Sequence, residues 1–320
     1  MNTKICISIS TYDAFEDINL SANILRSNWN LKEELYLIAG LCKKDSSKYL
    51  NKGLFDSYIN IETPKTHLTS ISSDESSFDS INARLFNSFI KTGIKAIENK
   101  CDYILYLNSG SWILKPEKIL DLISDIKNNT VGVRVMSRFK YLLVEDHFFI
   151  INLKKAKNYD LFNVSNDGRI FNTFSAPING IHGILRAWIN SLPYGEVFVY
   201  CDHMNSYDEL GQSPVKFNPL IFDKKYYFLH SNKKYREVKM LRSIFLQKYL
   251  KNKNNFIKEF ILQNNKLYGG FTILTKPIPH LKITLFRKIL YFITFGKRGI
   301  YNKIRRWPVK IKIIDNQKYK

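Results

Sequence analysis

Short, strongly apolar runs alternate with segments of helical periodicity along the first part of the chain, and this alternation most constrains the fold. Residues 5–10, 35–40 and 103–107 are apolar almost throughout. They are therefore expected to be strands buried on both faces. Apolar residues recur at helical spacing over residues 17–28 and from residue 81 to residue 97. Strands that alternate with helices in this way predict an α/β protein with a mostly parallel sheet flanked by helices.

The pattern continues with less regularity toward the C-terminus. Further strands are expected at residues 57–61, 131–136, 148–152, 197–201 and 225–229, and further helices at 117–127 and 184–191. Beyond Lys233 the chain is expected to be helical, with breaks at Pro277 and Pro279. We therefore expect a body formed by residues 1–232 and a basic helical region formed by residues 233–320.

The positive charge is concentrated in the last third of the chain. The net charge is +21, but residues 1–150 carry 18 basic and 18 acidic side chains, whereas residues 224–320 carry 25 basic and 3 acidic ones. A neutral body with a basic C-terminal region indicates an anionic partner. An anionic membrane, a nucleic acid and a phosphorylated substrate all fit this charge distribution.

The cysteine pattern and the N-terminal sequence favour the cytoplasm. Cys6, Cys42, Cys101 and Cys201 form no C-x-x-C pair, which argues against a disulfide framework or a zinc site. The chain opens without a secretory signal pattern. It also lacks a run of about 20 apolar residues, the length that a membrane-spanning helix requires.

Two segments resemble a known family. The first is residues 91–112, in which Thr92-Gly93-Ile94-Lys95-Ala96 leads to the apolar strand 103–107 and then to the polar turn Asn108-Ser109-Gly110-Ser111. The second is the opening strand, which ends in Ser10-Thr11-Tyr12-Asp13. Over about residues 4–125 the chain resembles the GT-A glycosyltransferases that use nucleotide sugars, as in bacterial surface-polysaccharide synthesis. The resemblance implies a GT-A, Rossmann-like fold, with Ser10, Thr11, Tyr12 and Asp13 beside the nucleotide base and ribose.

The chain departs from that family where the family binds a metal. In GT-A enzymes the strand ends in an Asp-x-Asp motif, whose carboxylates hold a divalent cation that bridges the donor diphosphate. Here the turn is Asn108, Ser109, Gly110 and Ser111, and none of these residues ionises near neutral pH. A hard divalent cation prefers anionic oxygen ligands, so tight metal binding is not expected. The chain is then either a metal-independent enzyme, which we favour, or an inactive one.

Without a metal, other groups must neutralise the charge of the leaving diphosphate. The nearest candidates in the sequence follow the expected strand 225–229 and are His230, Lys233, Lys234 and Arg236. The alternative is that these basic side chains simply solvate the first turn of a helix.

An inverting transfer also requires a carboxylate that takes the proton of the acceptor hydroxyl. Asp202 follows one expected strand and Asp146 precedes another, so both are candidates. Asp208 and Glu209 are weaker ones. Each of these residues could instead be an exposed loop acid or a helix cap. The sequence leaves open whether the transfer inverts or retains the anomeric configuration.

His182 lies between two glycines just before the expected helix 184–191. Glycines at a helix start allow a ligand to approach backbone amides, so His182 is a candidate for acceptor binding, with a plain turn as the alternative. The six histidines show no metal-ligand spacing, and we expect no metal site from them.

The segment from Leu281 to Ile314 carries ten Lys or Arg residues and no acidic one, with apolar side chains at helical spacing. This pattern is typical of an amphipathic helix that lies on anionic lipid. A packed C-terminal helix pair with a solvated basic face is the alternative.

The sequence therefore supports three hypotheses. The leading one is transfer of a sugar from a nucleotide-sugar donor to a glycan or lipid-linked glycan, such as a precursor of lipopolysaccharide, O-antigen or capsule. The enzyme would be cytoplasmic and peripheral on the inner face of the membrane, with no cofactor required. The second is a non-catalytic GT-A-like partner of a polysaccharide-assembly complex. The third, nucleic-acid binding, is disfavoured because no nucleic-acid motif is present and the basic residues alternate with large apolar ones.

Overall fold

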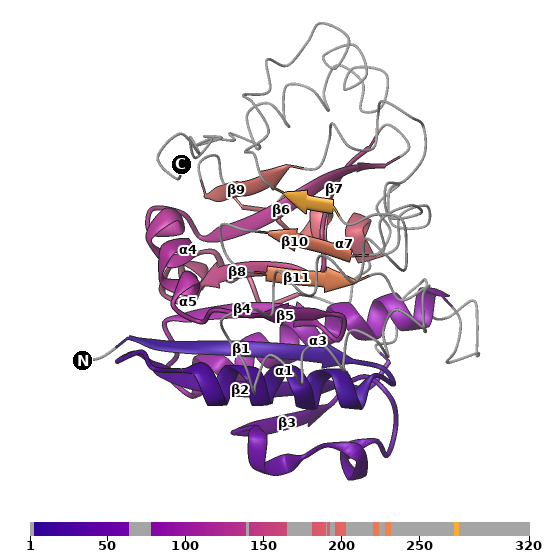
Figure 1. Cartoon of the computed structure of the whole chain (residues 1–320). Helices are drawn as coiled ribbons and strands as arrows, with labels where there is room; N and C mark the ends of the chain where they lie inside the picture. The colour runs from indigo at the N-terminus through magenta and orange to yellow at the C-terminus, as the bar shows by residue number, and fades with distance from the viewer. Residues whose placement is uncertain are drawn as a thin grey trace, which may run out of the picture.

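Two β-sheets form the centre of the molecule, and helices cover both faces of the larger sheet (Figure 1). The computed structural model describes residues 3–63, 78–138, 141–164, 181–189, 191–192, 196–202, 220–223, 228–231 and 272–274. In spatial order, the larger sheet contains β3 (Ser57–Asn60), β2 (Glu34–Leu41), β1 (Lys4–Thr11), β4 (Tyr103–Asn108), β8 (Phe148–Asn152), β6 (Val131–Arg138) and β7 (Tyr141–Val144). The strand β9 (Val197–Asp202) also pairs with β6.

Most strands of the larger sheet run in one direction. β1 is parallel to β2 and β4, and β2 is parallel to β3. β8 is antiparallel to both β4 and β6, so β6 and its parallel neighbour β9 run in the same direction as β4. Of these eight strands, β8 and β7 run the other way. The fold class predicted from the sequence, a Rossmann-like, mixed but mostly parallel sheet flanked by helices, is confirmed.

The central strand β1 is buried on both faces, which explains its continuous apolar sequence. Ile5, Ile7 and Ile9 belong to one apolar cluster, together with residues of α1 (Phe15–Asn28) and α4 (Lys118–Ile126). The alternate residues of β1 face α3 (Phe78–Glu98) on the opposite side of the sheet. Side chains of successive strand residues point to opposite faces, so two helical layers enclose this strand.

The α3 side of β1 carries paired hydroxyl groups as well as apolar side chains. Ser8 Oγ donates a hydrogen bond of 2.9 Å to Thr92 Oγ1, and Ser10 Oγ lies 2.7 Å from Ser88 Oγ. All four residues are buried. Because a buried hydroxyl is costly unless it is hydrogen-bonded, these pairs fix the position of α3 relative to β1. The helices α5 (Leu153–Ala156) and α7 (Ile181–Ile189) contribute to the same apolar cluster as α3.

A smaller sheet starts directly after β4. Its strands are, in order, β12 (Thr272–Leu274), β10 (Leu220–Asp223), β11 (Phe228–Ser231) and β5 (Ser111–Ile113). β5 follows β4 after a two-residue turn, so the smaller sheet begins at the carboxyl end of β4. The rings of Phe148 and Phe228 stack at 4.5 Å between centroids and connect the two sheets.

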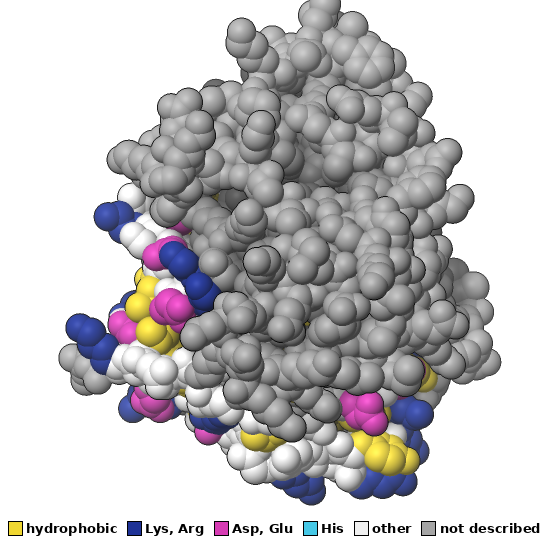
Figure 2. Space-filling view, in the orientation of Figure 1, with side chains coloured by type: hydrophobic (Ala, Val, Ile, Leu, Met, Phe, Trp, Pro, Cys, Tyr) yellow, Lys and Arg dark blue, Asp and Glu magenta, His cyan; other side chains and the backbone are white. Residues whose placement is uncertain are grey.

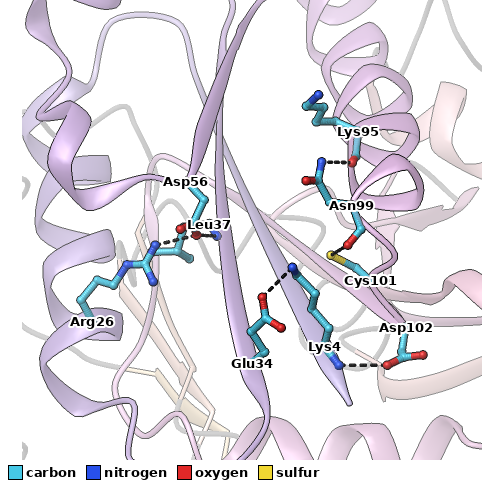
Figure 3. A network of polar contacts seen from close by, with 9 residues as sticks. All are labelled: Lys4, Arg26, Glu34, Leu37, Asp56, Lys95, Asn99, Cys101 and Asp102. Atoms are coloured by element: carbon cyan, nitrogen blue, oxygen red, sulfur yellow. Dashed lines mark hydrogen bonds and ion pairs between the residues drawn. The ribbon is translucent and has the colours of Figure 1, made fainter. Parts of the chain in front are cut away.

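Charged side chains tie the strands together at the opposite, amino end of the larger sheet (Figure 3). The backbone N–H of Lys4 donates to Asp102 Oδ2 at 2.9 Å, and Lys4 Nζ lies 2.5 Å from Glu34 Oε1. The hydrogen bond to Glu34 raises the pKa of Lys4. Asp56 Oδ2 accepts hydrogen bonds from Arg26 Nη2 at 2.6 Å and from the N–H of Leu37 at 2.7 Å. The groups at this end bind one another, and their role is structural.

The described surface in the view of Figure 2 carries basic and acidic side chains side by side. This mixture agrees with the equal numbers of basic and acidic residues in positions 1–150. None of the helices in the described ranges combines the length and the hydropathy needed to cross a bilayer. The basic segment 281–314 and the helical region expected after Lys233 lie outside these ranges, apart from β12.

The structure departs from the sequence-based expectation in several places. β5, β7 and β10 were not expected as separate strands. The strand expected at 225–229 is β11, which lies at Phe228–Ser231, so His230 belongs to the strand and does not follow it. β12 is a strand in a region expected to be helical, and it pairs in parallel with β10. The helix predicted at 184–191 begins earlier, at Ile181, because Asn82 Oδ1 on α3 accepts a hydrogen bond of 3.1 Å from the N–H of Ile181. The boundary between residues 232 and 233 stays a prediction.

We predict that Asp56→Ala lowers the free energy of unfolding by about 1–3 kcal/mol, because it leaves the buried N–H of Leu37 without its acceptor. Asp56→Asn keeps an oxygen for that N–H and should lose less. Urea unfolding followed by circular dichroism measures both values. An Asp56→Ala protein as stable as the wild type would contradict a structural role for this contact.

Candidate functional site

The strand order reverses at β1, and this reversal marks the candidate site. From β1 the chain proceeds outward to β2 and β3, and then returns to place β4 on the other side of β1. In open α/β sheets, ligands bind at such a switch point, outside the carboxyl ends of the strands. Ser10, near the end of β1, pairs with Gly40 on β2 and with Asn108 on β4. The two segments singled out in the sequence, residues 10–13 and 108–111, therefore lie side by side at this point.

The four predicted residues at the end of β1 are of two kinds. Ser10 and Thr11 make structural contacts, whereas Tyr12 and Asp13 reach the surface. Ser10 is bound to Ser88, and Thr11 Oγ1 accepts a hydrogen bond of 2.9 Å from the N–H of Ala14. Both Ser10 and Thr11 are buried, whereas Tyr12 is partly exposed and Asp13 is exposed. Of the four predicted residues, Tyr12 and Asp13 are thus placed to contact a ligand through their side chains.

Arg84 on α3 also belongs to this end of the sheet, and the sequence analysis missed it. Its guanidinium carbon lies 5.1 Å from the centroid of the Tyr12 ring, and its Nη1 donates a hydrogen bond of 3.2 Å to Thr63 Oγ1. The residue is only 3% exposed. A cation over an aromatic face stabilises the ring's position, so Arg84 holds Tyr12 in place. The sequence contained one signal for Arg84, which is an arginine among the apolar residues of a predicted helix. A charged residue is rarely buried unless it is paired, so a buried arginine indicates a specific partner.

The turn after β4 is fixed by the side chain of Asn108. Its Oδ1 accepts hydrogen bonds from the N–H of Gly110 at 3.0 Å and from Ser111 Oγ at 3.1 Å. These two contacts define which end of the amide is the oxygen, and they direct Nδ2 toward His147, whose Nδ1 lies 2.5 Å away. Within the described ranges the buried hydroxyl of Ser109 has no hydrogen-bond partner. Such a group costs about 1–3 kcal/mol and is often found at functional sites.

The smaller sheet brings His230 next to this turn. His230 on β11 pairs with Ser111 on β5 in an antiparallel register. The backbone of His230 therefore lies beside the turn, although more than one hundred residues separate the two in the sequence. Lys233, Lys234 and Arg236 lie outside the described ranges, as do Asp208 and Glu209.

An irregularity between β7 and β8 positions Asp146 and His147. On β6, Gly132 pairs with Ile150 of β8, and Val135 pairs with Val144 of β7. These two pairs are three residues apart on β6 but six residues apart on the partner segment. The three additional residues are Glu145, Asp146 and His147, which interrupt the strand as a bulge. Bulges of this kind reorient side chains and are frequent near active sites. Leu107 pairs with Phe148, so the bulge lies at the carboxyl end of β4.

Asp146 and His182, which the sequence singled out separately, lie close together. Asp146 Oδ1 is 3.1 Å from His147 Nδ1 and 3.6 Å from His182 Nδ1. His182 Nδ1 lies 3.0 Å from the carbonyl oxygen of Val144, and the two imidazole rings meet edge to face at 6.1 Å between centroids. His182 belongs to the first turn of α7 and does not precede the helix as expected.

Asp202 is the last residue of β9, and its backbone pairs with Val135. Val135 also pairs with Val144 on its other edge. Two strand spacings of about 4.8 Å therefore separate the backbones of Asp202 and Val144, and Asp146 follows Val144 by two residues. Both candidate bases lie at the same edge of the sheet as Asn108.

The donor groups at the β4 turn do not fit a divalent cation of the Mg²⁺ type. All four turn residues are uncharged, and Asn108 Oδ1 already accepts two hydrogen bonds. Such cations are normally held by carboxylate oxygens. The described ranges contain no group of three His, Cys, Asp or Glu residues arranged to hold a metal ion.

Comparison with known proteins gives structural similarities only. No family model matches the chain, and no curated protein does. A crystal structure of the galactosyltransferase LgtC in complex with donor and acceptor sugar analogues is 16% identical, with a TM-score of 0.40 over 68% of this chain and 76% of LgtC. The glycosyltransferase GlyE of Streptococcus pneumoniae TIGR4 is 12% identical, with a TM-score of 0.39 over 95% of this chain and 64% of GlyE.

A third similar structure is not a glycosyltransferase. It is a CMP:2-keto-3-deoxy-manno-octonic acid synthetase in complex with CTP, 8% identical, with a TM-score of 0.36 over 62% of this chain and 90% of the synthetase. At these identities and TM-scores, the similarities assign neither an activity nor a ligand to the chain.

The packing of Gly40 at the switch point can be tested directly. A Cβ atom at this position would lie 2.1 Å from Ser88 Oγ and 2.9 Å from Ser10 Oγ. We predict that Gly40→Ala lowers the free energy of unfolding by about 1–3 kcal/mol, as overpacked substitutions do. Ser88→Ala removes the nearer oxygen, so the double variant should lose less than the two single variants together.

Gly53→Ala is the matched control, because its nearest neighbour is Asn51 Oδ1 at 3.6 Å, and it should have little effect. Strictly additive effects of Gly40→Ala and Ser88→Ala in urea unfolding would contradict the close contact.

Proposed function

We propose that this chain is a nucleotide-sugar-dependent glycosyltransferase that acts on a surface-glycan precursor such as lipopolysaccharide, O-antigen or capsule. The observation that carries the proposal is the pairing of Ser10 with Asn108 at the switch point of the sheet. It joins the two segments on which the resemblance to GT-A glycosyltransferases rests. It does so at the position where sheets of this class bind nucleotides.

The residues at this edge suit the two halves of a nucleotide-sugar donor. The nucleoside would lie at the end of β1, against Tyr12 and Asp13, with Arg84 behind the Tyr12 ring. The diphosphate would cross the end of β4, over the turn that contains Asn108 and Ser109. The sugar and the acceptor would then lie toward the bulge and α7, which carry Asp146 and His182.

The transfer itself exchanges one bond for another at the anomeric carbon. The bond between this carbon and the diphosphate oxygen breaks, and its electron pair stays on the diphosphate. The oxygen of the acceptor hydroxyl forms the new bond, and its proton passes to a base. For an inverting displacement, Asp146 and Asp202 are the proposed bases, and His182 is the proposed contact of the acceptor.

We further propose that no tightly bound metal takes part. The uncharged donor groups of the turn support this proposal, because they do not match the ligands of a hard cation. His230, whose backbone lies beside the turn, and Lys233, Lys234 and Arg236 would then balance the charge of the leaving diphosphate.

The distribution of charge along the sequence supports a proposed location on the membrane and a proposed lipid-linked acceptor. The chain would be cytoplasmic and peripheral on the inner face of the membrane, held by the segment from Leu281 to Ile314. Each Lys or Arg near an anionic surface contributes about 1 kcal/mol, and this segment carries ten and no acidic residue. A lipid-linked glycan would be within reach of an enzyme that lies on that surface.

The uncharged turn also favours a second candidate, a non-catalytic GT-A-like partner of a polysaccharide-assembly complex. In that case Asn108 and Gly110 would occupy the positions of lost carboxylates. Binding of a nucleotide sugar by the double variant Asn108→Asp and Gly110→Asp, with none in the wild type, would favour this candidate.

Thermal unfolding of the full chain with nucleotides tests the proposed function first. Ligands that bind the folded state raise its stability by mass action, by about 2.7 kcal/mol at one hundred times Kd. We expect one class of nucleoside diphosphate or nucleotide sugar to raise Tm, and the increase should persist in EDTA. An absence of any increase, with or without Mg²⁺ or Mn²⁺, would contradict the proposal and favour the non-catalytic partner.

Substitution of the two candidate bases tests their role in transfer. If Asp146 or Asp202 is the base, its replacement by Asn should lower the transfer rate by about 10²- to 10⁴-fold. Nucleotide-induced stabilisation should remain. Glu98→Gln, an exposed change at the far end of α3, is the control. Wild-type transfer rates in both Asn variants would exclude these carboxylates as bases.

A further inference from the structure

The hydrogen-bond partner of His182 determines which of its ring nitrogens carries the proton in the neutral state. His182 Nδ1 lies 3.0 Å from the backbone carbonyl oxygen of Val144. A carbonyl oxygen only accepts hydrogen bonds, so Nδ1 must be the donor. In the neutral ring the other nitrogen, Nε2, then has no proton and carries a lone pair. His182 can therefore accept a hydrogen bond, or a proton, through Nε2.

The Nε2 side of the ring is the side that the surrounding structure leaves unused. Within the part of the chain that the structure describes, the polar contacts of His182 are made by Nδ1, to Val144 and toward Asp146. The lone pair of Nε2 points nearly opposite to the Nδ1–H bond, because the two nitrogens lie on either side of Cε1. The side chain is 14% exposed. A ligand hydroxyl can therefore be the partner of Nε2.

The contact between His182 and Asp146 suits the protonated ring better than the neutral one. Asp146 Oδ1 lies 3.6 Å from His182 Nδ1. This distance is too long for a hydrogen bond, but two opposite charges attract each other over it. The contact thus becomes stronger when the ring takes up a second proton. A carboxylate near Nδ1 stabilises the imidazolium that forms when a histidine acts as a base.

Packing of α7 holds His182 in this position. The N–H of Ile181 donates a hydrogen bond of 3.1 Å to Asn82 Oδ1 on α3, which fixes the first turn of α7. Ile181 itself is buried in the core. Val144, which binds Nδ1, is the last residue of β7, and the bulge that carries Asp146 follows it directly. A base must be held within hydrogen-bond reach of the proton that it removes, and these contacts fix the imidazole at the carboxyl end of β4.

We propose that His182 is the general base of the transfer, with Asp146 as the positioning residue that stabilises its protonated form. This inference rests on the proposed function and specifies the path of the proton. The O–H bond of the acceptor hydroxyl breaks, its proton passes to His182 Nε2, and its electron pair forms the bond from oxygen to the anomeric carbon. The bond to the diphosphate breaks, with its electrons on the diphosphate. Water later takes the proton from the imidazolium. Of the two carboxylates considered as bases, Asp146 then acts through the imidazole.

Release of nucleoside diphosphate by the full chain tests this role, with UDP-glucose, UDP-galactose, UDP-N-acetylglucosamine and GDP-mannose as donors and water as the acceptor. A glutamine at position 182 can still accept a hydrogen bond, but it takes up no proton. In His182→Gln we therefore expect kcat to fall about 10²- to 10⁴-fold. KM for the donor and the increase in Tm with nucleotide should stay close to the wild-type values. Glu98→Gln, the exposed control, should keep the wild-type rate.

The double variant His182→Gln and Asp146→Asn distinguishes a base from a simple contact of the acceptor. If Asp146 acts through His182, the double variant should release diphosphate at about the rate of His182→Gln alone. Residues that act as one catalytic unit have strongly non-additive effects. If Asp146 is itself the base and His182 only contacts the acceptor, the two losses should multiply.

Nitrogen NMR of the ligand-free protein tests the tautomer without any substrate. For the neutral ring of His182 in the wild type, we expect a protonated Nδ1 and a non-protonated Nε2. The signals of this ring are assigned by their loss in His182→Gln. Thermal unfolding of each ligand-free variant verifies that it is folded.

The outcomes separate this inference from the proposed function. A wild-type rate in His182→Gln, losses that multiply in the double variant, or a neutral His182 protonated at Nε2 would overturn the role of His182 and leave the proposed function intact. A wild-type protein that releases no diphosphate from any of the four donors would contradict both.

Discussion

Parallel pairing of β1 with β2 on one edge and with β4 on the other is the constraint on which the remaining structure depends. It makes β1 the central strand, buried by helices on both faces, and it creates the switch point at its carboxyl end. The amino ends of the same strands are held by charged groups that bind one another, such as Lys4 with Glu34 and Arg26 with Asp56. Structural contacts are thus concentrated at one end of these strands, and the candidate site lies at the other.

The contact between β1 and α3 shows how closely this arrangement is packed. Gly40 leaves room for the hydroxyl groups of Ser10 and Ser88, which bind each other. A Cβ atom at position 40 would lie 2.1 Å from Ser88 Oγ, so any side chain there would disturb this pair of hydroxyl groups. Since Arg84 projects from α3 toward Tyr12, the same packing sets the position of the aromatic ring at the site.

The fold class and the two halves of the site could be predicted from the sequence, because they depend on local patterns. Continuous apolar runs indicate strands buried on both faces, and short polar segments after residues 10 and 107 indicate the ends of such strands. Contacts between distant segments could not be predicted in this way. The pairing of His230 with Ser111 and the bulge at Glu145–His147 depend on register, which no local pattern determines. Arg84 was missed because it lies on an otherwise ordinary helix.

Hydrogen–deuterium exchange of the full chain, with and without a saturating nucleoside diphosphate, tests the central claim most directly. The claim is that a nucleotide binds at the switch point between β1 and β4. We predict that the ligand slows exchange in residues 10–13 and 108–111 together, and that exchange at the amino ends of β1 and β4 changes little. Protection confined to other parts of the chain would contradict this assignment, as would no protection at a ligand concentration that raises Tm.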